Sequence, residues 1–202
     1  MNNQIAEENG AVNHQQPKGF KKYASFFLEL VKIAVIAFLI VLPIRYFLFQ
    51  PFIVSGASME PNFSSGDYLI VDEISYRFEG PKRGDVVIFN AGFIPNYGNE
   101  RFIKRVVGLP GETINIKDGK VDITKDGQTF ALDENYLPGD VKTLGDVNLE
   151  LEVEQYFVLG DNRAYSYDSR MWGALPRDYI IGKAFFRVFP LASLSGIPQP
   201  AY

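Results

Sequence analysis

Residues 26–49 read FFLELVKIAVIAFLIVLPIRYFLF and form a long apolar segment near the start of the chain. As an α-helix this segment extends about 36 Å at ~1.5 Å per residue, which is enough to cross a hydrocarbon core of about 30 Å. Glu29, Lys32 and Arg45 interrupt it, but charges near the ends of a span can reach the lipid headgroups. The segment therefore predicts a transmembrane helix over residues 26–49.

Two other interpretations of the apolar segment are a buried core helix and the apolar part of a cleavable signal peptide. No small-x-small cleavage site follows directly, and residues 46–54 remain bulky. Both observations favour an anchor that is retained in the mature protein.

The charges on either side of the segment predict its orientation. Three lysines precede it: Lys18, Lys21 and Lys22. After Arg45, the next basic residue is Arg77. The positive-inside rule then predicts a cytoplasmic tail over residues 1–25 and an extracytoplasmic domain over residues 50–202.

The composition removes several kinds of active site. The chain has no cysteine, which excludes disulfides, thiolate metal sites and a cysteine nucleophile. Its one histidine, His14, lies in a polar stretch at residues 2–18 that we expect to be disordered, so a Ser-His-Asp triad is disfavoured. A net charge of −4 gives no general basic face for nucleic acid, so we expect no nucleic-acid partner.

The rest of the chain has the pattern of a mainly β protein. Short apolar runs divided by turn residues predict strands at 68–71, 85–89, 102–107, 156–159 and 180–188. Asp118-Gly119 separates residues 113–116 from 120–124, which is a strong hairpin signal. We therefore expect an all-β domain behind one transmembrane helix, with a small inserted β sub-lobe at about residues 118–154.

A serine-containing turn follows the predicted anchor. It reads Ser55-Gly-Ala-Ser58-Met-Glu-Pro61. Gly56 permits a tight backbone path before Ser58, and Pro61 restricts the path after it. Such a turn presents the Ser58 hydroxyl as a candidate nucleophile, although turns of this composition are often only turns.

A serine nucleophile needs a base, and the candidate is Lys104 in the predicted strand at 102–107. On one face of that strand Lys104 is bracketed by Phe102 and Val106. Burial disfavours the charged form of an amine, and a pKa depressed by ~3 units from ~10.4 leaves a lysine that accepts a proton near neutral pH. The alternative is that Lys104 reaches solvent and pairs with an acid.

A third polar cluster follows the predicted strand at 156–159. It reads Gly160-Asp-Asn-Arg-Ala-Tyr-Ser166-Tyr-Asp168-Ser-Arg170. Asp168 and Arg170 are suited to a bidentate ion pair, and Ser166 to a hydrogen bond near an amine. The alternative is a solvated loop.

Taken in order, these segments resemble type I signal peptidases, the membrane-anchored Ser/Lys proteases that remove signal peptides from exported preproteins. The resemblance extends from Phe26 to Pro190. Its marks are Ser58-Met-x-Pro, Gly66-Asp-Tyr-Leu-Ile-Val, Arg83-Gly-Asp-Val-Val, Phe102-Ile-Lys-Arg-Val-Val-Gly-Leu-Pro-Gly, the Gly160–Arg170 segment, Trp172-Gly and Ile181-Gly-Lys-Ala.

The resemblance implies roles for individual residues. Ser58 matches the nucleophile, Lys104 the general base and Ser166 the residue that orients the lysine by a hydrogen bond. Asp168 and Arg170 match a supporting ion pair. Asp161 and Arg163 match two further positions of the Gly160–Arg170 segment. Met59 matches a position that packs near the nucleophile and the substrate pocket. Gly56 stands where some members have a serine that completes the oxyanion hole, so the second oxyanion donor is open here.

The resemblance also implies the setting of the reaction. We expect cleavage after small residues at the −1 and −3 positions of signal peptides, at the outer face of the cytoplasmic membrane, without metal or cofactor. The expected partners are preprotein signal peptides, the lipid bilayer and the secretion translocon. The alternative function is an inactive membrane-tethered relative that binds or helps assemble exported proteins.

Overall fold

The computed structural model describes residues 18–202, apart from 48, 140, 192–193, 198–199 and 201–202. The chain divides between Pro43 and Ile44 into two compact units. The predicted disorder at residues 2–18 and the position of His14 lie outside the described residues, except for Lys18 itself, which is helical.

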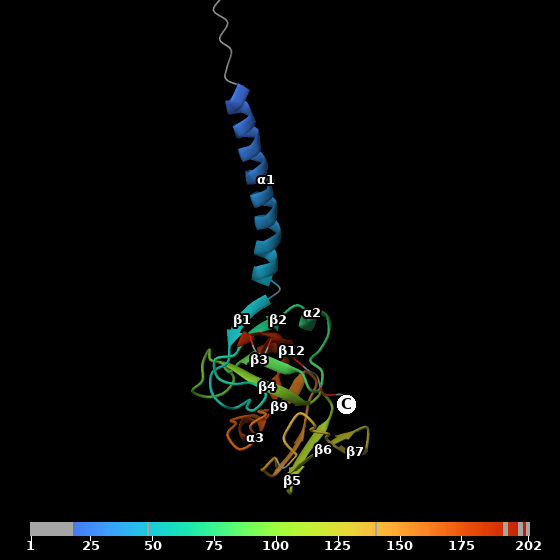
Figure 1. The fold of residues 1–202 in the computed structure, drawn as a ribbon. Coiled ribbons are helices and arrows are strands. Elements are labelled where there is room, and N and C mark those ends of the chain that lie inside the picture. The colour runs from blue at the N-terminus through green and yellow to red at the C-terminus, as the bar shows by residue number, and fades with distance from the viewer. Residues whose placement is uncertain (1–17, 48, 140, 192–193, 198–199, 201–202) are drawn as a thin grey trace, which may run out of the picture. The chain divides into compact units, whose positions relative to one another are not determined.

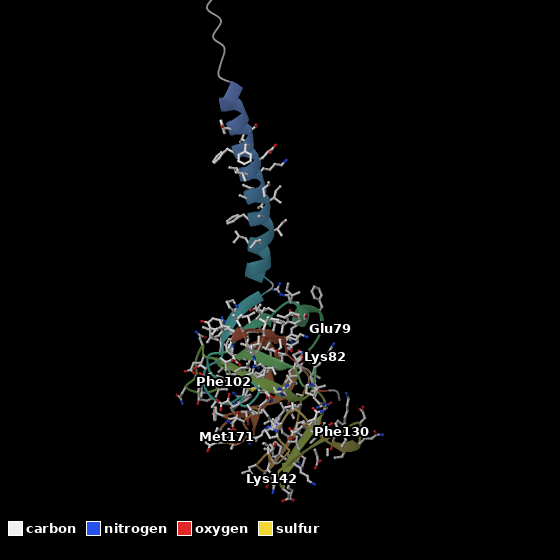
Figure 2. The ribbon with its side chains drawn as sticks, in the orientation of Figure 1. Glu79, Lys82, Phe102, Phe130, Lys142 and Met171 are labelled. Atoms are coloured by element: carbon white, nitrogen blue, oxygen red, sulfur yellow. The ribbon has the colours of Figure 1, made fainter. Side chains whose placement is uncertain are left out.

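Helix α1, Lys18–Phe47, makes up the described part of the first unit and continues a few residues past its end at Pro43. Its most apolar window is Ser25–Leu42, with a mean hydropathy of 2.5. Apolar side chains there are mostly exposed, as at Phe27 and Leu39, and Figure 2 shows side chains projecting outward from the helix. The helix begins eight residues before the predicted span of 26–49, because the helical backbone includes the polar residues from Lys18 onward. It ends at Phe47, two residues before the end of that span, because Phe49 already belongs to a strand.

The second unit is mainly β, as predicted, and its larger sheet has eight antiparallel strands. Its order is β1-β2-β11-β3-β4-β9-β10, and β12 pairs with β11 (Figure 1). The strands are β1 (Phe49–Ile53), β2 (Tyr68–Asp72), β3 (Val86–Asn90), β4 (Arg101–Gly108), β9 (Gln155–Leu159), β10 (Leu175–Pro176), β11 (Ile180–Phe189) and β12 (Ser195–Gly196).

A second sheet of four strands has the order β7-β6-β5-β8. The strands are β5 (Thr113–Lys117), β6 (Lys120–Lys125), β7 (Gln128–Ala131) and β8 (Val147–Glu150). Asp118 and Gly119 both have positive φ, 52° and 81°, as a two-residue hairpin turn between right-twisted strands requires. The sheet takes in β5, so it begins at Thr113 and not at the expected 118, because β5 pairs with both β6 and β8.

Short helical turns connect some of the strands. They are α2 (Ser75–Phe78), α3 (Ser169–Trp172) and the 3₁₀ turn η1 (Arg177–Tyr179). Asp168 caps α3, because its carboxylate accepts the Arg170 N–H. This cap is one of several contacts that fix the polar segment before α3.

Strand β4 contributes to all three hydrophobic clusters of the domain. Ile103 belongs to one cluster, Val107 to the cluster that includes the inner face of β5 and β6, and Val106 to the cluster around Phe89. Each of these side chains is at least 96% buried, with exposures of 4%, 0% and 0% respectively. Full burial of such side chains contributes about 1.5–3 kcal/mol each, so β4 is a rigid base for Lys104.

Candidate active site

The loop between β1 and β2 carries Ser58. Its ends are joined by two backbone hydrogen bonds: the Val54 N–H donates to the Asp67 carbonyl and the Gly66 N–H donates to the Val54 carbonyl, both at 2.9 Å. Within the loop Gly56 has φ = 91°, a conformation that glycine adopts without steric cost. The loop is therefore closed at its base and turns sharply just before Ser58.

Lys104 lies on β4 with its amine beside that loop. Its Nζ donates to Ser58 Oγ at 2.8 Å and to the Ile103 carbonyl at 2.9 Å. The residue is only 4% exposed, and Nζ is 5.4 Å from the centroid of the Phe102 ring. The structure thus brings together the two residues that the sequence singled out as nucleophile and base.

Burial lowers the pKa of Lys104 from 10.5 to about 8, because desolvation disfavours the ammonium form. The carboxylates of Asp168 and Asp161 act in the opposite direction and keep the pKa from falling further. With a pKa of about 8, roughly one lysine in ten is neutral at pH 7. A neutral amine at 2.8 Å from a hydroxyl is placed to accept its proton.

Asp168 and Arg170 form a bidentate ion pair. Arg170 Nε donates to Asp168 Oδ1 at 2.8 Å and Nη2 donates to Oδ2 at 2.9 Å. Oδ2 also accepts the Gly160 N–H at 3.0 Å. Asp168 is fully buried, so its charge acts on Lys104 with little screening from water.

Asp161 and Arg163 each pair with a residue that the sequence did not point out. Asp161 receives Arg105 Nε at 2.8 Å and Nη2 at 2.6 Å. Arg163 contacts Glu134 at 2.6 Å and also donates to Thr143 Oγ1. Arg105 could have been noticed as a charge inside an apolar strand, but nothing local in the sequence identifies these partners.

The hydrogen bond from Ser166 to Lys104 that the resemblance implies is absent from the described residues, and Met59 lies in the core next to Ser58. The Ser166 hydroxyl is buried and has no hydrogen-bond partner in the described part of the chain, so it does not bond Lys104 here. A Cβ added to Gly160 would lie 2.1 Å from Ser166 Oγ and 2.4 Å from the Ser58 carbonyl oxygen, so Ser166 lies beside the Ser58 backbone. Met59 is fully buried in the hydrophobic cluster that includes Ile103, and does not line the groove described next.

Ser58 and Lys104 open into a groove of about 360 Å³. Its walls come from three segments: residues 52–53 and 55–58, residues 101–104, and Tyr165 and Tyr167 of the Gly160–Arg170 segment. Beside it, β4 pairs with β3 along residues 101–105 but with β9 only from Arg105 onward. One edge of residues 101–104 is therefore not used by β9.

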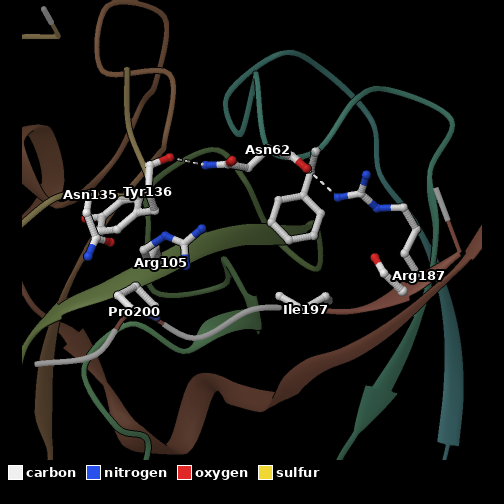
Figure 3. Close-up of a pocket in the computed structure, with 9 residues that line it drawn as sticks. Asn62, Arg105, Asn135, Tyr136, Arg187, Ile197 and Pro200 are labelled. Atoms are coloured by element: carbon white, nitrogen blue, oxygen red, sulfur yellow. Dashed lines mark hydrogen bonds between the residues drawn. The ribbon is translucent and has the colours of Figure 1, made fainter. Parts of the chain in front are cut away.

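A second and larger cavity, of about 520 Å³, lies elsewhere on the domain and contains neither Ser58 nor Lys104 (Figure 3). Its two arginines already contact carboxylates, Arg105 with Asp161 and Arg187 with Asp67. No group of His, Asp or Glu side chains suited to a metal ion occurs among the described residues. The groove at Ser58 is consequently the stronger candidate for an active site.

A hydroxyl and a buried amine of lowered pKa, placed together at a groove of about 360 Å³, are typical of serine hydrolases that use lysine as the base. Comparison with known proteins agrees with this class. A family model described as signal peptidase, peptidase S26, matches residues 27–189, and the chain belongs to this family. Helix α1 fits the single membrane anchor of such a membrane-bound protein.

Curated relatives carry the same name. A probable signal peptidase I-2 from Synechocystis sp. is 39% identical over 173 residues, covering 81% of this chain and 74% of the relative. A signal peptidase I from Leptolyngbya laminosa is 38% identical over 182 residues, covering 87% and 86%. Signal peptidase I T of Bacillus subtilis is 36% identical over 188 residues, covering 88% and 93%.

A solved structure was also found. The crystal structure of a signal peptidase I from Enterococcus faecalis is 28% identical, covers 52% of this chain and 97% of its own, and has a TM-score of 0.43.

Proposed function

We propose that this protein is an endopeptidase that removes signal peptides from exported preproteins, with Ser58 as the nucleophile and Lys104 as the general base. One observation carries the mechanism: Lys104 Nζ lies 2.8 Å from Ser58 Oγ in an environment that lowers the pKa of the amine to about 8. The family membership supports the reaction. An inactive relative would be marked by loss of the serine or the lysine, and both are present.

The first half of the reaction forms an ester. Neutral Lys104 takes the proton of the Ser58 hydroxyl while Ser58 Oγ bonds to the scissile carbonyl carbon. The carbonyl oxygen becomes an oxyanion in the tetrahedral intermediate. The bond from carbon to the leaving nitrogen then breaks, and the ammonium of Lys104 gives its proton to that nitrogen. The mature protein leaves, and the signal peptide remains as an acyl group on Ser58.

The second half of the reaction repeats these roles with water. Lys104, again neutral, removes a proton from water as the water oxygen attacks the ester carbon. The bond to Ser58 Oγ breaks, and the proton returns from Lys104 to Ser58. The products are the free signal peptide and the regenerated enzyme.

The substrate is expected to bind as an added strand. The edge of β4 that β9 leaves unused lies along residues 101–104, and these residues also line the groove. An extended peptide there gains main-chain hydrogen bonds, while alternate side chains enter pockets. Shallow pockets that admit only small side chains would then select the −1 and −3 residues.

The polar residues around the pair act as supports. Asp168, held by Arg170, and Asp161, held by Arg105, keep the pKa of Lys104 from falling below its working range. Arg163 ties this segment to residues 134–143 through Glu134 and Thr143. Ser166 orients Lys104 only if its hydroxyl turns toward the amine in the substrate complex. Met59, the next residue of the loop, is fully buried in the core and anchors the loop there.

The proposed location follows from α1 and from the lysines in its first two turns. A cytoplasmic tail over residues 1–25 and a peptidase domain over residues 50–202 place the site at the outer face of the cytoplasmic membrane. Preproteins reach that face from the translocon with their signal helices in the bilayer. A shared membrane raises the effective concentration of enzyme and substrate.

The test is cleavage of a purified preprotein by the full chain in detergent, with the cut mapped by mass spectrometry. We expect one cut after a small-x-small sequence for the wild type and for the control Lys120→Ala, whose side chain is exposed. Ser58→Ala and Lys104→Ala should show none. Equal cutting by all four proteins would contradict the assignment, and no cutting by folded wild type would favour the inactive alternative.

A further inference from the structure

Asn162 holds two consecutive carbonyl groups of the loop that carries Ser58. Its side-chain Nδ2 donates to the Ala57 carbonyl oxygen at 3.0 Å. Its backbone N–H donates to the Ser58 carbonyl oxygen, also at 3.0 Å. The Glu60 N–H adds a weaker contact to the Ala57 oxygen, at 3.2 Å. The orientation of the Ala57 carbonyl is therefore set mainly by the amide of Asn162.

The Ala57 carbonyl and the Ser58 N–H belong to one peptide group. This peptide bond is trans, since cis bonds occur only before Pro61 and Pro190 in the described chain. In a planar trans peptide the C=O and N–H point in opposite directions. A hydrogen bond that fixes the Ala57 oxygen therefore also fixes the direction of the Ser58 N–H.

The Ser58 N–H makes no hydrogen bond to any of the described residues. It is available for the oxygen of a bound carbonyl group, beside the hydroxyl that attacks that carbonyl. At Gly56 no side chain is present to supply a second donor, and a Cβ there would meet nothing within 4 Å. The Ser58 N–H therefore supplies a larger share of the oxyanion stabilisation than it would if residue 56 were a serine. Its direction matters correspondingly more.

Asn162 itself lies away from the groove. It lines a separate hollow of about 460 Å³ with Pro61 and Ala164, and it is not among the residues that line the groove at Ser58. Residues 55–58 of the loop line the groove, while Asn162, which lines the neighbouring hollow, holds the loop through Ala57 and Ser58. Asn162 therefore acts on the groove through the loop and not as one of the residues that line it.

We propose that Asn162 is a positioning residue of the oxyanion hole, which aims the Ser58 N–H by holding the Ala57 carbonyl. This inference rests on the proposed role of Ser58 as nucleophile. Loss of the Nδ2 donor frees the peptide group to rotate. The cost appears in the transition state, where the oxyanion develops, and not in the binding of the intact substrate.

The test uses Asn162→Ala and Asn162→Asp. The aspartate has nearly the same shape, but its carboxylate oxygens cannot donate to the Ala57 carbonyl. Complete loss of an oxyanion donor costs about 10²- to 10³-fold in kcat, so for a misdirected donor we expect a fall of about 10- to 100-fold, with KM changed less than about twofold. The control is Asn148→Ala, at an exposed asparagine of β8, which should match the wild type.

A peptide aldehyde with small residues at −1 and −3 gives a second readout. Its hemiacetal with Ser58 places an oxygen in the oxyanion hole, so its affinity should fall by the same factor as kcat. Binding of an uncleaved peptide of the same sequence, measured with Ser58→Ala and with Ser58→Ala/Asn162→Ala, should be equal. Melting temperatures of the folded variants separate this effect from a general loss of structure.

Three results would overturn the inference: unchanged kcat in both variants, a raised KM with unchanged kcat, or a lower kcat with unchanged aldehyde affinity. Failure of the proposed function itself has a different signature. In that case the wild type neither cleaves the peptide nor forms an adduct with the aldehyde at Ser58.

Discussion

Replacing Lys104 by methionine is expected to stabilise the folded domain at pH 7, although it removes the proposed base. Burial lowers the pKa of Lys104 from 10.5 to about 8, and each pKa unit corresponds to about 1.36 kcal/mol. At pH 7 the buried ammonium therefore costs about 3 kcal/mol relative to the unfolded chain. Lys104 is only 4% exposed, so solvent screening reduces this figure little.

Methionine keeps most of the volume of the lysine stem and carries no charge. The variant loses the hydrogen bonds of Nζ to Ser58 and to the Ile103 carbonyl, each worth about 1 kcal/mol. We therefore expect a net gain of about 1–2 kcal/mol in the free energy of unfolding at pH 7.

The pH dependence isolates the charge from the lost contacts. The pKa of Lys104 in the folded state lies below its unfolded value, so the unfolded chain binds more protons between pH 8 and 10.5. The wild type consequently gains stability as pH rises through this window, and the variant does not share that gain. The advantage of Lys104→Met should shrink by about 3 kcal/mol from pH 7 to pH 10.5 and leave the wild type the more stable protein there.

The assay is denaturant unfolding of the full chain in detergent micelles at the two pH values. The chain has one tryptophan, Trp172, which packs against Phe89 and Phe93 in the domain and reports its unfolding. Lys120→Met, at an exposed position, serves as the control for pH effects unrelated to burial. The reasoning is refuted if the difference between wild type and Lys104→Met is the same at both pH values.

Three further predictions follow from the same contacts. The wild-type kcat/KM should fall about tenfold per pH unit below about pH 8, as Lys104 becomes protonated, and a pH-independent rate from 6 to 9 would contradict this. Asp168→Asn removes the largest carboxylate contribution to the pKa of Lys104, so the midpoint of that pH profile should move to lower pH. The same change leaves Arg170 without its bidentate partner and should cost about 3 kcal/mol in an unfolding titration. Gly160→Ala forces a Cβ against Ser166 and the Ser58 carbonyl, so it should lower both kcat and stability, the latter by about 1–3 kcal/mol. Gly139→Ala, where a Cβ meets nothing within 4 Å, should change neither.

Local signals in the sequence predicted much of the secondary structure. The Asp118-Gly119 pair predicted the hairpin between β5 and β6, because both residues must adopt positive φ. The alternation along 102–107 placed Lys104 on the same side as Phe102, and Nζ does lie near that ring. Strand β1 was not predicted, because Pro51 breaks the pattern and is tolerated only since β1 is an edge strand.

The contacts between site residues that are distant in the sequence could not be predicted from local sequence patterns. The pairing of Arg105 with Asp161 joins residues that are 56 positions apart in the sequence, and the contact of Asn162 with the Ala57 carbonyl spans 105 positions. Such contacts depend on the order of strands in the sheet, which places β4 between β3 and β9. No periodicity within one segment encodes that order. The proposed nucleophile and base were singled out through local chemistry and the resemblance, whereas the groups that hold them required the fold.

The central claim is that Ser58 becomes acylated through proton transfer to Lys104. The most direct measurement is acid quenching of a reaction with a signal-peptide substrate, followed by mass spectrometry of the peptide that contains Ser58. We expect that peptide to carry the acyl group in the wild type and to remain unmodified in Lys104→Ala. An acyl group on another residue, or an equally acylated Ser58 in Lys104→Ala, would contradict the account.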